Sequence, residues 1–155
     1  MLRLGVRYLV DELVPHRGPM SLLDSIDGYG EDWLRSSLTV RPDSTFAVPG
    51  GVPGWAGIEY MAQAACALAG IEPVQRGDLP SIGLLIGSRY YRCMLDLIPL
   101  GTHLQVFAKL VMRDAEDFAA YECTLNAGTQ RIAECTLKAY RPRDLGTLLR
   151  AAARD

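Results

Sequence analysis

Four segments in the second half of the chain are strand-like, and in the second of them apolar and polar residues alternate as in a half-buried β-strand. These predicted strands are residues 82–94, 102–113, 118–126 and 131–140. Gly- and Pro-containing turns are predicted between them at 98–101 and 126–129. In the second strand, the alternation predicts one shared face for Leu104, Val106, Ala108, Leu110 and Met112.

The first half of the chain predicts shorter elements. A short helix is expected within residues 1–14, ended by Pro15, and a turn at 16–20. Strands are expected to start at 22–27 and to run over 33–40. The Pro and Gly residues of 46–53 predict an irregular segment there.

Residues 53–70 form an apolar and small-residue stretch that predicts a helix buried on all sides. Pro53 and Gly54 are typical of a helix start, Gly70 of a helix end, and Pro73 is expected not to continue the helix. A loop is then predicted over 72–81. One long helix followed by four strands in series indicates an α+β fold, with an antiparallel sheet wrapped around a central helix.

The 155-residue chain suits one domain, predicted to span residues 1–140. Composition changes over 141–155, where two interpretations stay open. Asp144 caps a short C-terminal helix, or the segment is a frayed tail.

The net charge of −2 and the pI of about 5.7 do not indicate nucleic-acid binding. The first residues lack the pattern of a secretory signal. The apolar stretch after Pro53 holds only about 16 helix-compatible residues, short of the ~20 that span a membrane, so no span is expected.

Four scattered cysteines, Cys66, Cys93, Cys123 and Cys135, contain no C-x-x-C pair, which fits reduced thiols and a cytoplasmic location. The chain has only two histidines, so no metal site is expected.

Glu59 is the only charged residue between Asp43 and Glu72. A carboxylate within a buried helix loses hydration, which makes it a candidate general acid or base. Gln63 lies one turn later on the same face. Alternatively, Glu59 is a structural carboxylate bonded to backbone or to an arginine.

Two motifs in the chain resemble those of the β-hydroxyacyl-acyl-carrier-protein dehydratases. Residues 14–20, Val-Pro-His-Arg-Gly-Pro-Met, resemble that family's Pro-His-Arg signature. Pro53-Gly54, Glu59 and Met61-Ala62-Gln63 resemble its central-helix motif. Pro99-Leu100-Gly101 is similar to a later turn of the family, and within the family the likeness is greatest to the divergent dehydratase-like proteins of aryl polyene clusters.

The resemblance implies the hot-dog fold, a dimer with edge-to-edge sheets, and active sites at the dimer interface. It implies loss of water from a 3-hydroxyacyl thioester held on an acyl carrier protein. No cofactor is implied beyond the phosphopantetheine of the carrier protein or of CoA. The expected partners are an acyl carrier protein and a hot-dog subunit, either a second copy or a different protein.

The chain departs from the family at the position of its usual catalytic histidine, where Thr45 stands. Three interpretations follow. A different hot-dog subunit supplies the histidine across a heterodimer interface, and this chain contributes Glu59 and Gln63. Alternatively, His16 replaces the lost histidine, although a histidine in such a loop often serves only to order a turn. In the third, the site is inactive, hydrolyses thioesters or only binds acyl groups.

Dehydration requires a base, an acid, and hydrogen-bond donors for the developing enolate oxygen. The backbone N–H groups of Gly54 and Trp55, at the helix start, are candidate donors. Arg17, with Arg89 and Arg92, is a candidate contact for an acidic carrier protein or the pantetheine phosphate, or each is a solvated surface charge. His103 is expected to be exposed, and Trp55 and Met61 to line the core or a tunnel.

The predicted function is therefore dehydration of 3-hydroxyacyl thioesters, with a site shared across a dimer interface. A thioesterase that uses Glu59 to activate water is one alternative. A non-catalytic subunit that stabilises a catalytic hot-dog partner is the other.

Overall fold

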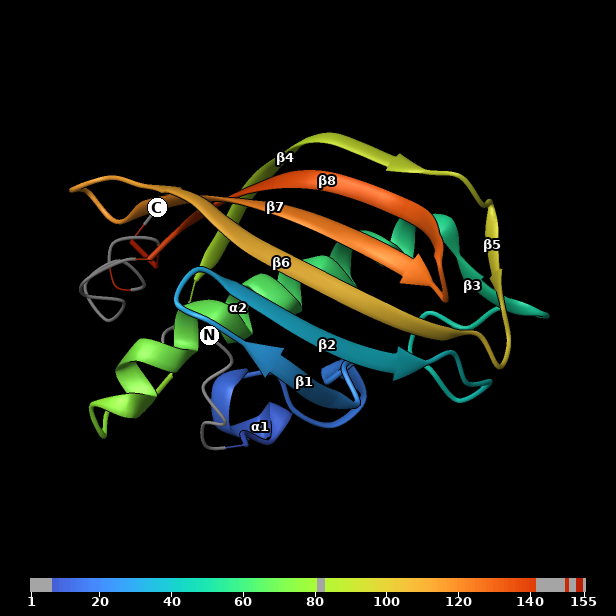
Figure 1. Ribbon diagram of the computed structural model, residues 1–155, viewed down its shortest axis with the longest axis horizontal. Coiled ribbons are helices and arrows are strands. Elements are labelled where there is room, and N and C mark those ends of the chain that lie inside the picture. Colours follow the sequence, from blue (N-terminus) through green and yellow to red (C-terminus); the bar gives the residue numbers. More distant parts are fainter. Residues whose placement is uncertain (1–6, 81–82, 142–149, 151–152, 155) are drawn as a thin grey trace.

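The computed structural model of the chain describes residues 7–80, 83–141, 150 and 153–154. Its main feature is a six-stranded antiparallel sheet in the order β1-β2-β6-β7-β8-β4 (Figure 1). The strands are β1 (Ser25–Tyr29), β2 (Trp33–Thr39), β4 (Leu84–Cys93), β6 (His103–Arg113), β7 (Phe118–Ala127) and β8 (Gln130–Tyr140). The four strands predicted in the second half are thus confirmed within a few residues at each end.

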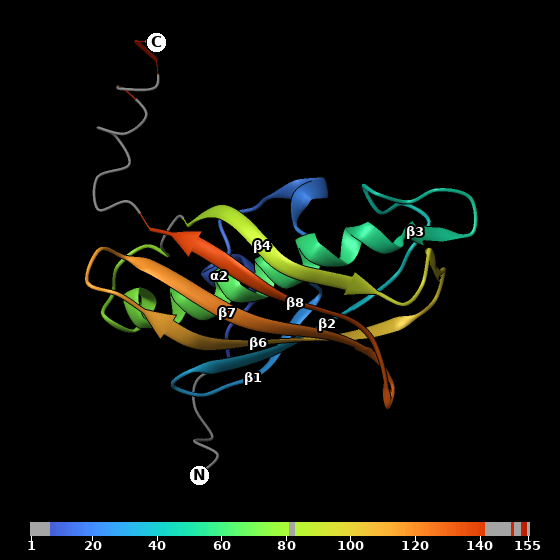
Figure 2. The same cartoon turned by 90° about the horizontal axis from the view of Figure 1, so that it is seen from above.

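A single long helix, α2 (Gly57–Gln75), packs against the concave face of this sheet (Figures 1 and 2). A 3₁₀ turn, η2 (Gly54–Ala56), leads into it. Tyr60, Met61, Ala64 and Ala67 of the helix are almost fully buried against Leu104, Val106, Leu125 and Leu137 of the sheet core. The predicted architecture, a sheet wrapped around one central helix, is confirmed.

The predicted end of the central helix at Gly70 is wrong, because α2 continues through Pro73 to Gln75. Gly70 is required for another reason: an added Cβ would lie 2.6 Å from the carbonyl oxygen of Leu13, which packs against it. Just beyond the helix and its C-cap Arg76 lies Gly77, whose φ of 84° is readily adopted by glycine. Gly77 N–H donates to the Val74 carbonyl and Asp78 N–H to that of Pro73, which is a Schellman motif.

Turns form at residues 49–50 and 100–101, as predicted, but the neighbouring residues of the irregular segment and of the turn at 98–101 contribute to a second, two-stranded sheet. It pairs β3 (Gly51–Pro53) with β5 (Leu97–Pro99). The prediction failed because glycine serves here to permit close backbone approach. A Cβ on Gly51 would clash with the Ile98 carbonyl, and one on Gly54 with the Leu95 carbonyl.

The N-terminal region is less helical than the sequence predicted. Only α1 (Val10–Leu13) forms, followed by a 3₁₀ turn, η1 (Gly18–Met20), at the predicted turn. Leu9 is already extended, and residues 1–6 lie outside the described part of the chain. The strand predicted to start at 22–27 begins at Ser25, while the predicted cap at Asp144 lies outside the described residues.

Alternation along β6 holds for only part of the strand. Leu104, Val106 and Ala108 are buried, but Met112 is 51% exposed, against the prediction. The pairing of β6 with β7 shifts register between Leu110 and Met112, which moves the last residues off the core face. No helix of the described residues is long and apolar enough to cross a membrane.

Candidate active site

The structure brings His16 and Glu59 together. Nε2 of His16 lies 3.9 Å from Oε1 of Glu59, in the first turn of α2. Their side chains are 32% and 30% exposed, so the predicted full burial of Glu59 is wrong: this face of the helix lines a cavity. An imidazole beside a carboxylate, in a partly desolvated position, is an arrangement that can move protons.

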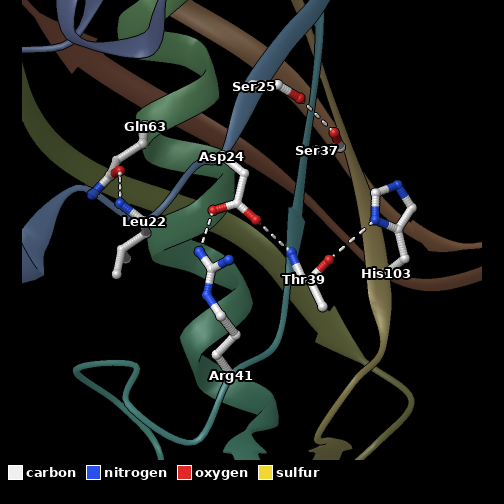
Figure 3. A network of polar contacts seen from close by, with 8 residues as sticks. All are labelled: Leu22, Asp24, Ser25, Ser37, Thr39, Arg41, Gln63 and His103. Atoms are coloured by element: carbon white, nitrogen blue, oxygen red, sulfur yellow. Dashed lines mark hydrogen bonds and ion pairs between the residues drawn. The ribbon is translucent and has the colours of Figure 1, made fainter.

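Gln63 connects this pair to the loop that carries His16. Its amide is fully buried. The Nε2 group donates to the Met20 carbonyl at 2.7 Å and to Oε1 of Glu59 at 3.4 Å. The Oε1 atom accepts a hydrogen bond from the Leu22 N–H at 3.0 Å (Figure 3). The contact expected between Gln63 and Glu59 is therefore present, and Gln63 also holds the chain on both sides of Ser21.

The segment after Leu22 is fixed by a second set of polar contacts (Figure 3). Asp24 accepts hydrogen bonds from Arg41 at 2.5 Å and from the Thr39 N–H at 2.8 Å. Ser25 and Ser37 share a further bond at 2.8 Å between β1 and β2. These contacts join the start of β1 to β2 and so limit movement of the chain next to Gln63.

Arg17 has a local role in the structure. Its guanidinium donates to the carbonyls of Val14 at 2.6 Å, His16 at 2.9 Å and Asp11 at 3.0 Å. These bonds hold the loop after α1 in the conformation that presents His16. The prediction that Arg17 contacts a carrier protein stays a prediction.

The ring of His16 has one nitrogen in a distinctive environment. Its Nδ1 atom is buried and has no hydrogen-bond partner in the described part of the chain. A proton on Nδ1 would be a buried, unpaired donor, at a cost of about 1–3 kcal/mol. In the other neutral tautomer Nδ1 is an unpaired acceptor, and the proton on Nε2 is directed toward Glu59.

His16 and Glu59 line one part of a cavity of about 260 Å³ that extends along α2 between the helix and the sheet. Its walls are mostly apolar. The helix contributes Ala62, Ala65, Cys66 and Ala69, and the strands contribute Leu85, Ala119, Leu137 and Ala139. Burial raises the pKa of the Cys66 thiol to about 11, so Cys66 is a neutral wall residue. A cavity of this composition suits an extended acyl chain.

The two residues predicted to offer backbone donors at the helix start do not line this cavity. The N–H of Gly54 donates to the Asp96 carbonyl at 2.8 Å and is already paired within the chain, while the role of Gly54 and Trp55 toward an enolate oxygen stays a prediction. Its carbonyl accepts a hydrogen bond from the Tyr91 hydroxyl. Trp55 is 58% exposed and packs edge-on against Phe46, rather than in the core or a tunnel.

Several further residues can be compared with their predicted environments. Met61 is fully buried in the core and His103 is exposed, as expected. The four cysteines are free, two of them buried and two half-buried. Among residues 7–80 and 83–141, no cluster of three or more His, Cys, Asp or Glu side chains is arranged to hold a metal ion.

Two parts of the cavity were not predicted from the sequence: its apolar walls and the end that is lined by charged residues. Ala62, Ala65, Cys66 and Ala69 recur at the spacing of one helix face, which is a signal that could have been used. Arg113, Asp117 and Arg141 come together only through strand pairing and packing against α2, which no local pattern predicts.

Comparison with known proteins identifies relatives of the chain. A family model described as "ApeP-like: ApeP dehydratase" matches residues 8–150. The structure titled "The Dehydratase Heterocomplex ApeI:P from Xenorhabdus doucetiae" is 29% identical, with a TM-score of 0.83, and the match covers 92% of this chain and 97% of that one. No curated protein matches the sequence.

More distant structures share the fold alone. A hypothetical thioesterase with coenzyme A from Streptococcus pneumoniae is 12% identical, with a TM-score of 0.59, and the match covers 76% of this chain and 84% of that one. The PaaI protein from the phenylacetic acid degradation operon of E. coli is also 12% identical, with a TM-score of 0.59 and coverage of 76% and 78%. These matches confirm the hot-dog fold.

Proposed function

The chain belongs to the ApeP-like dehydratase family, and we propose that it takes part in the dehydration of 3-hydroxyacyl thioesters held on an acyl carrier protein. One observation carries the proposal. The His16–Glu59 pair lies 3.9 Å apart in the wall of an apolar cavity that can accept an acyl chain. The substrate arrives on the phosphopantetheine of the carrier protein, and the residues supply the proton transfers without a cofactor of their own.

Glu59 is the base in this proposal. With the imidazole proton on Nε2, the Glu59 carboxylate is the member of the pair that presents lone pairs to the cavity, and the Gln63 amide orients it through a hydrogen bond. Glu59 takes the proton from C2 of the substrate, and the electron pair moves into the thioester. The Nε2–H of His16 donates a hydrogen bond to the oxygen on which negative charge develops.

Glu59 also acts as the acid in the second half of the reaction. The C3–O bond breaks, the C2–C3 double bond forms, and the departing hydroxyl takes the proton from Glu59 to leave as water. Glu59 is then a carboxylate again, so each turnover balances without an external proton.

The working form is proposed to be a heterodimer with a second hot-dog protein. The relative from Xenorhabdus doucetiae is described as a heterocomplex. In this chain, β4 lies at the edge of the large sheet and exposes Leu85, Ile86 and Tyr90 at 47%, 55% and 71%. An edge strand with exposed apolar side chains is prone to pair with another strand.

The test is a dehydration assay on a 3-hydroxyacyl carrier-protein substrate, with and without a second hot-dog protein as partner subunit. Glu59→Gln is expected to lower the rate by about 10²–10⁴-fold. His16→Asn keeps an N–H donor and is expected to lose less. His103→Asn, which changes an exposed histidine, is the matched control.

Other outcomes separate the alternatives. If His16→Asn is as inactive as Glu59→Gln, His16 is the base. If His16→Asn has no effect and activity requires the second hot-dog protein, that partner supplies the base. Release of free thiol by the chain alone supports a thioesterase. Full activity of Glu59→Gln in the complex overturns the proposal and leaves a stabilising subunit.

A further inference from the structure

At the end of the cavity away from Glu59, the side chain of Arg141 joins the sheet to the helix. Arg141 directly follows β8, and its backbone N–H donates to the Asp117 carbonyl at 3.1 Å. The Nη2 group donates to the carbonyl of Ala69 in α2 at 3.2 Å. Both Ala69 and Arg141 line the same cavity as Glu59.

Pro73 explains why the Ala69 carbonyl is available. In an α-helix this carbonyl would accept a hydrogen bond from the N–H four residues later, but proline has no N–H. Pro73 lies within α2 and is buried, so Ala69 loses its helical partner. A half-buried carbonyl without a hydrogen-bond partner is unfavourable. The guanidinium of Arg141 supplies that partner for Ala69.

The other charges at this end leave Arg141 in place. Arg113 also lines the cavity, but its Nη1 lies 3.6 Å from Oε2 of Glu72, which directs it toward the helix surface. Tyr121 lies beside both arginines, and burial raises the pKa of its hydroxyl, so it stays neutral. Asp117 also lines this end, and its carbonyl accepts the Arg141 backbone N–H. The bond from Arg141 to Ala69 therefore links the sheet to the helix beside these residues.

We propose that Arg141 is a specificity-determining residue that limits the length of the acyl chain accepted by this cavity. The inference rests on the proposed function for the identity of the ligand. Glu59 and Ala69 are ten helical residues apart, which is about 15 Å. An extended chain advances about 1.2 Å per bond, so roughly a dozen carbons fit before the bridge.

An apolar chain end that went further would displace the Arg141 hydrogen bond and desolvate its charge. Both effects are unfavourable, because the guanidinium and the Ala69 carbonyl would lose their partners. Shorter chains leave the bridge intact. The expected result is affinity that rises with each methylene up to the bridge and then stops rising.

The test measures binding of a series of saturated acyl-pantetheine thioesters to the full-length chain by calorimetry. Arg141→Ala is expected to extend the rising part of the profile, with about fourfold tighter binding for each newly buried methylene. Pro73→Ala restores an N–H for the Ala69 carbonyl and is expected to release Arg141 and shift the profile in the same direction. Ala69→Leu fills the cavity before the bridge and is expected to shorten the profile.

Arg131→Ala is the matched control, because Arg131 forms a surface ion pair with Glu134 and does not line the cavity. Its profile is expected to match the wild type. Melting curves verify that each variant is folded. A profile for folded Arg141→Ala that is the same as the wild type overturns the inference. Because binding needs no chemical step, a chain that sorts ligands by length but does not dehydrate them refutes only the proposed function.

Discussion

Replacing Gln63 by Leu removes a buried amide that bonds to three partners at once, with little change in volume. The Leu22 N–H loses its partner in a buried position, at a cost of about 1–3 kcal/mol. The Met20 carbonyl is part-buried, and its lost bond adds about 0.5–1.5 kcal/mol. We expect Gln63→Leu to lower the free energy of unfolding by about 2–4 kcal/mol.

Urea titration followed by circular dichroism measures this change, with an unaltered m-value expected. For a domain of this size, the loss corresponds to a melting temperature lower by about 6–12 °C, at about 3 °C per kcal/mol. Gln75→Leu is the control, because Gln75 lies exposed at the end of the same helix and its replacement should change stability by less than about 0.5 kcal/mol. If Gln63→Leu is as mild as Gln75→Leu, the buried network does not have the strength argued for it.

Three further predictions follow from individual residues. Gly70→Ala is expected to lower the free energy of unfolding, measured by urea titration, by about 1 kcal/mol, because the clash with the Leu13 carbonyl outweighs the gain in helix propensity. A variant more stable than the wild type would contradict this. The rate of Cys66 alkylation, followed by mass spectrometry, should still increase between pH 9 and about 11, and a rate that levels off at pH 9 would refute the raised pKa. The free energy of unfolding should fall over the same pH range, because the folded state disfavours the thiolate. Ile86→Lys on the exposed edge of β4 should weaken the complex with a second hot-dog protein in sedimentation experiments, whereas Thr129→Lys in an exposed turn should not.

The strands of the second half could be predicted from sequence because their alternation is a local pattern that the sheet preserves. The end of the central helix could not, since the partners of this region are distant in sequence. Arg141, far along the chain, donates to the Ala69 carbonyl that Pro73 leaves without its helical partner. The backbone of α1 packs against Gly70, so this glycine permits a close contact and does not end the helix.

In the candidate site, too, contacts between residues close in sequence could be predicted and those between distant segments could not. Glu59 and Gln63 are one helical turn apart, so their contact followed from spacing alone. The position of His16 depends on how the loop after α1 packs on α2. This packing cannot be predicted from sequence, so the sequence alone allows several roles for His16. The pairing of the Gly54 N–H with the Asp96 carbonyl could not be predicted from sequence, because this contact exists only once the segment before β5 has folded back.

Thr45, which the family resemblance places at the position of the usual histidine, is connected through one loop to His16 beside Glu59. The Thr45 hydroxyl donates to the Pro19 carbonyl at 2.5 Å, while Gln63 donates to the next carbonyl along, that of Met20. Arg17 holds the carbonyls on the other side. The residue at the histidine position therefore helps to fasten the loop that presents a different histidine. If this coupling is real, Thr45→Val should reduce dehydration through disorder of His16, and the same change in a His16→Asn background should add little further loss.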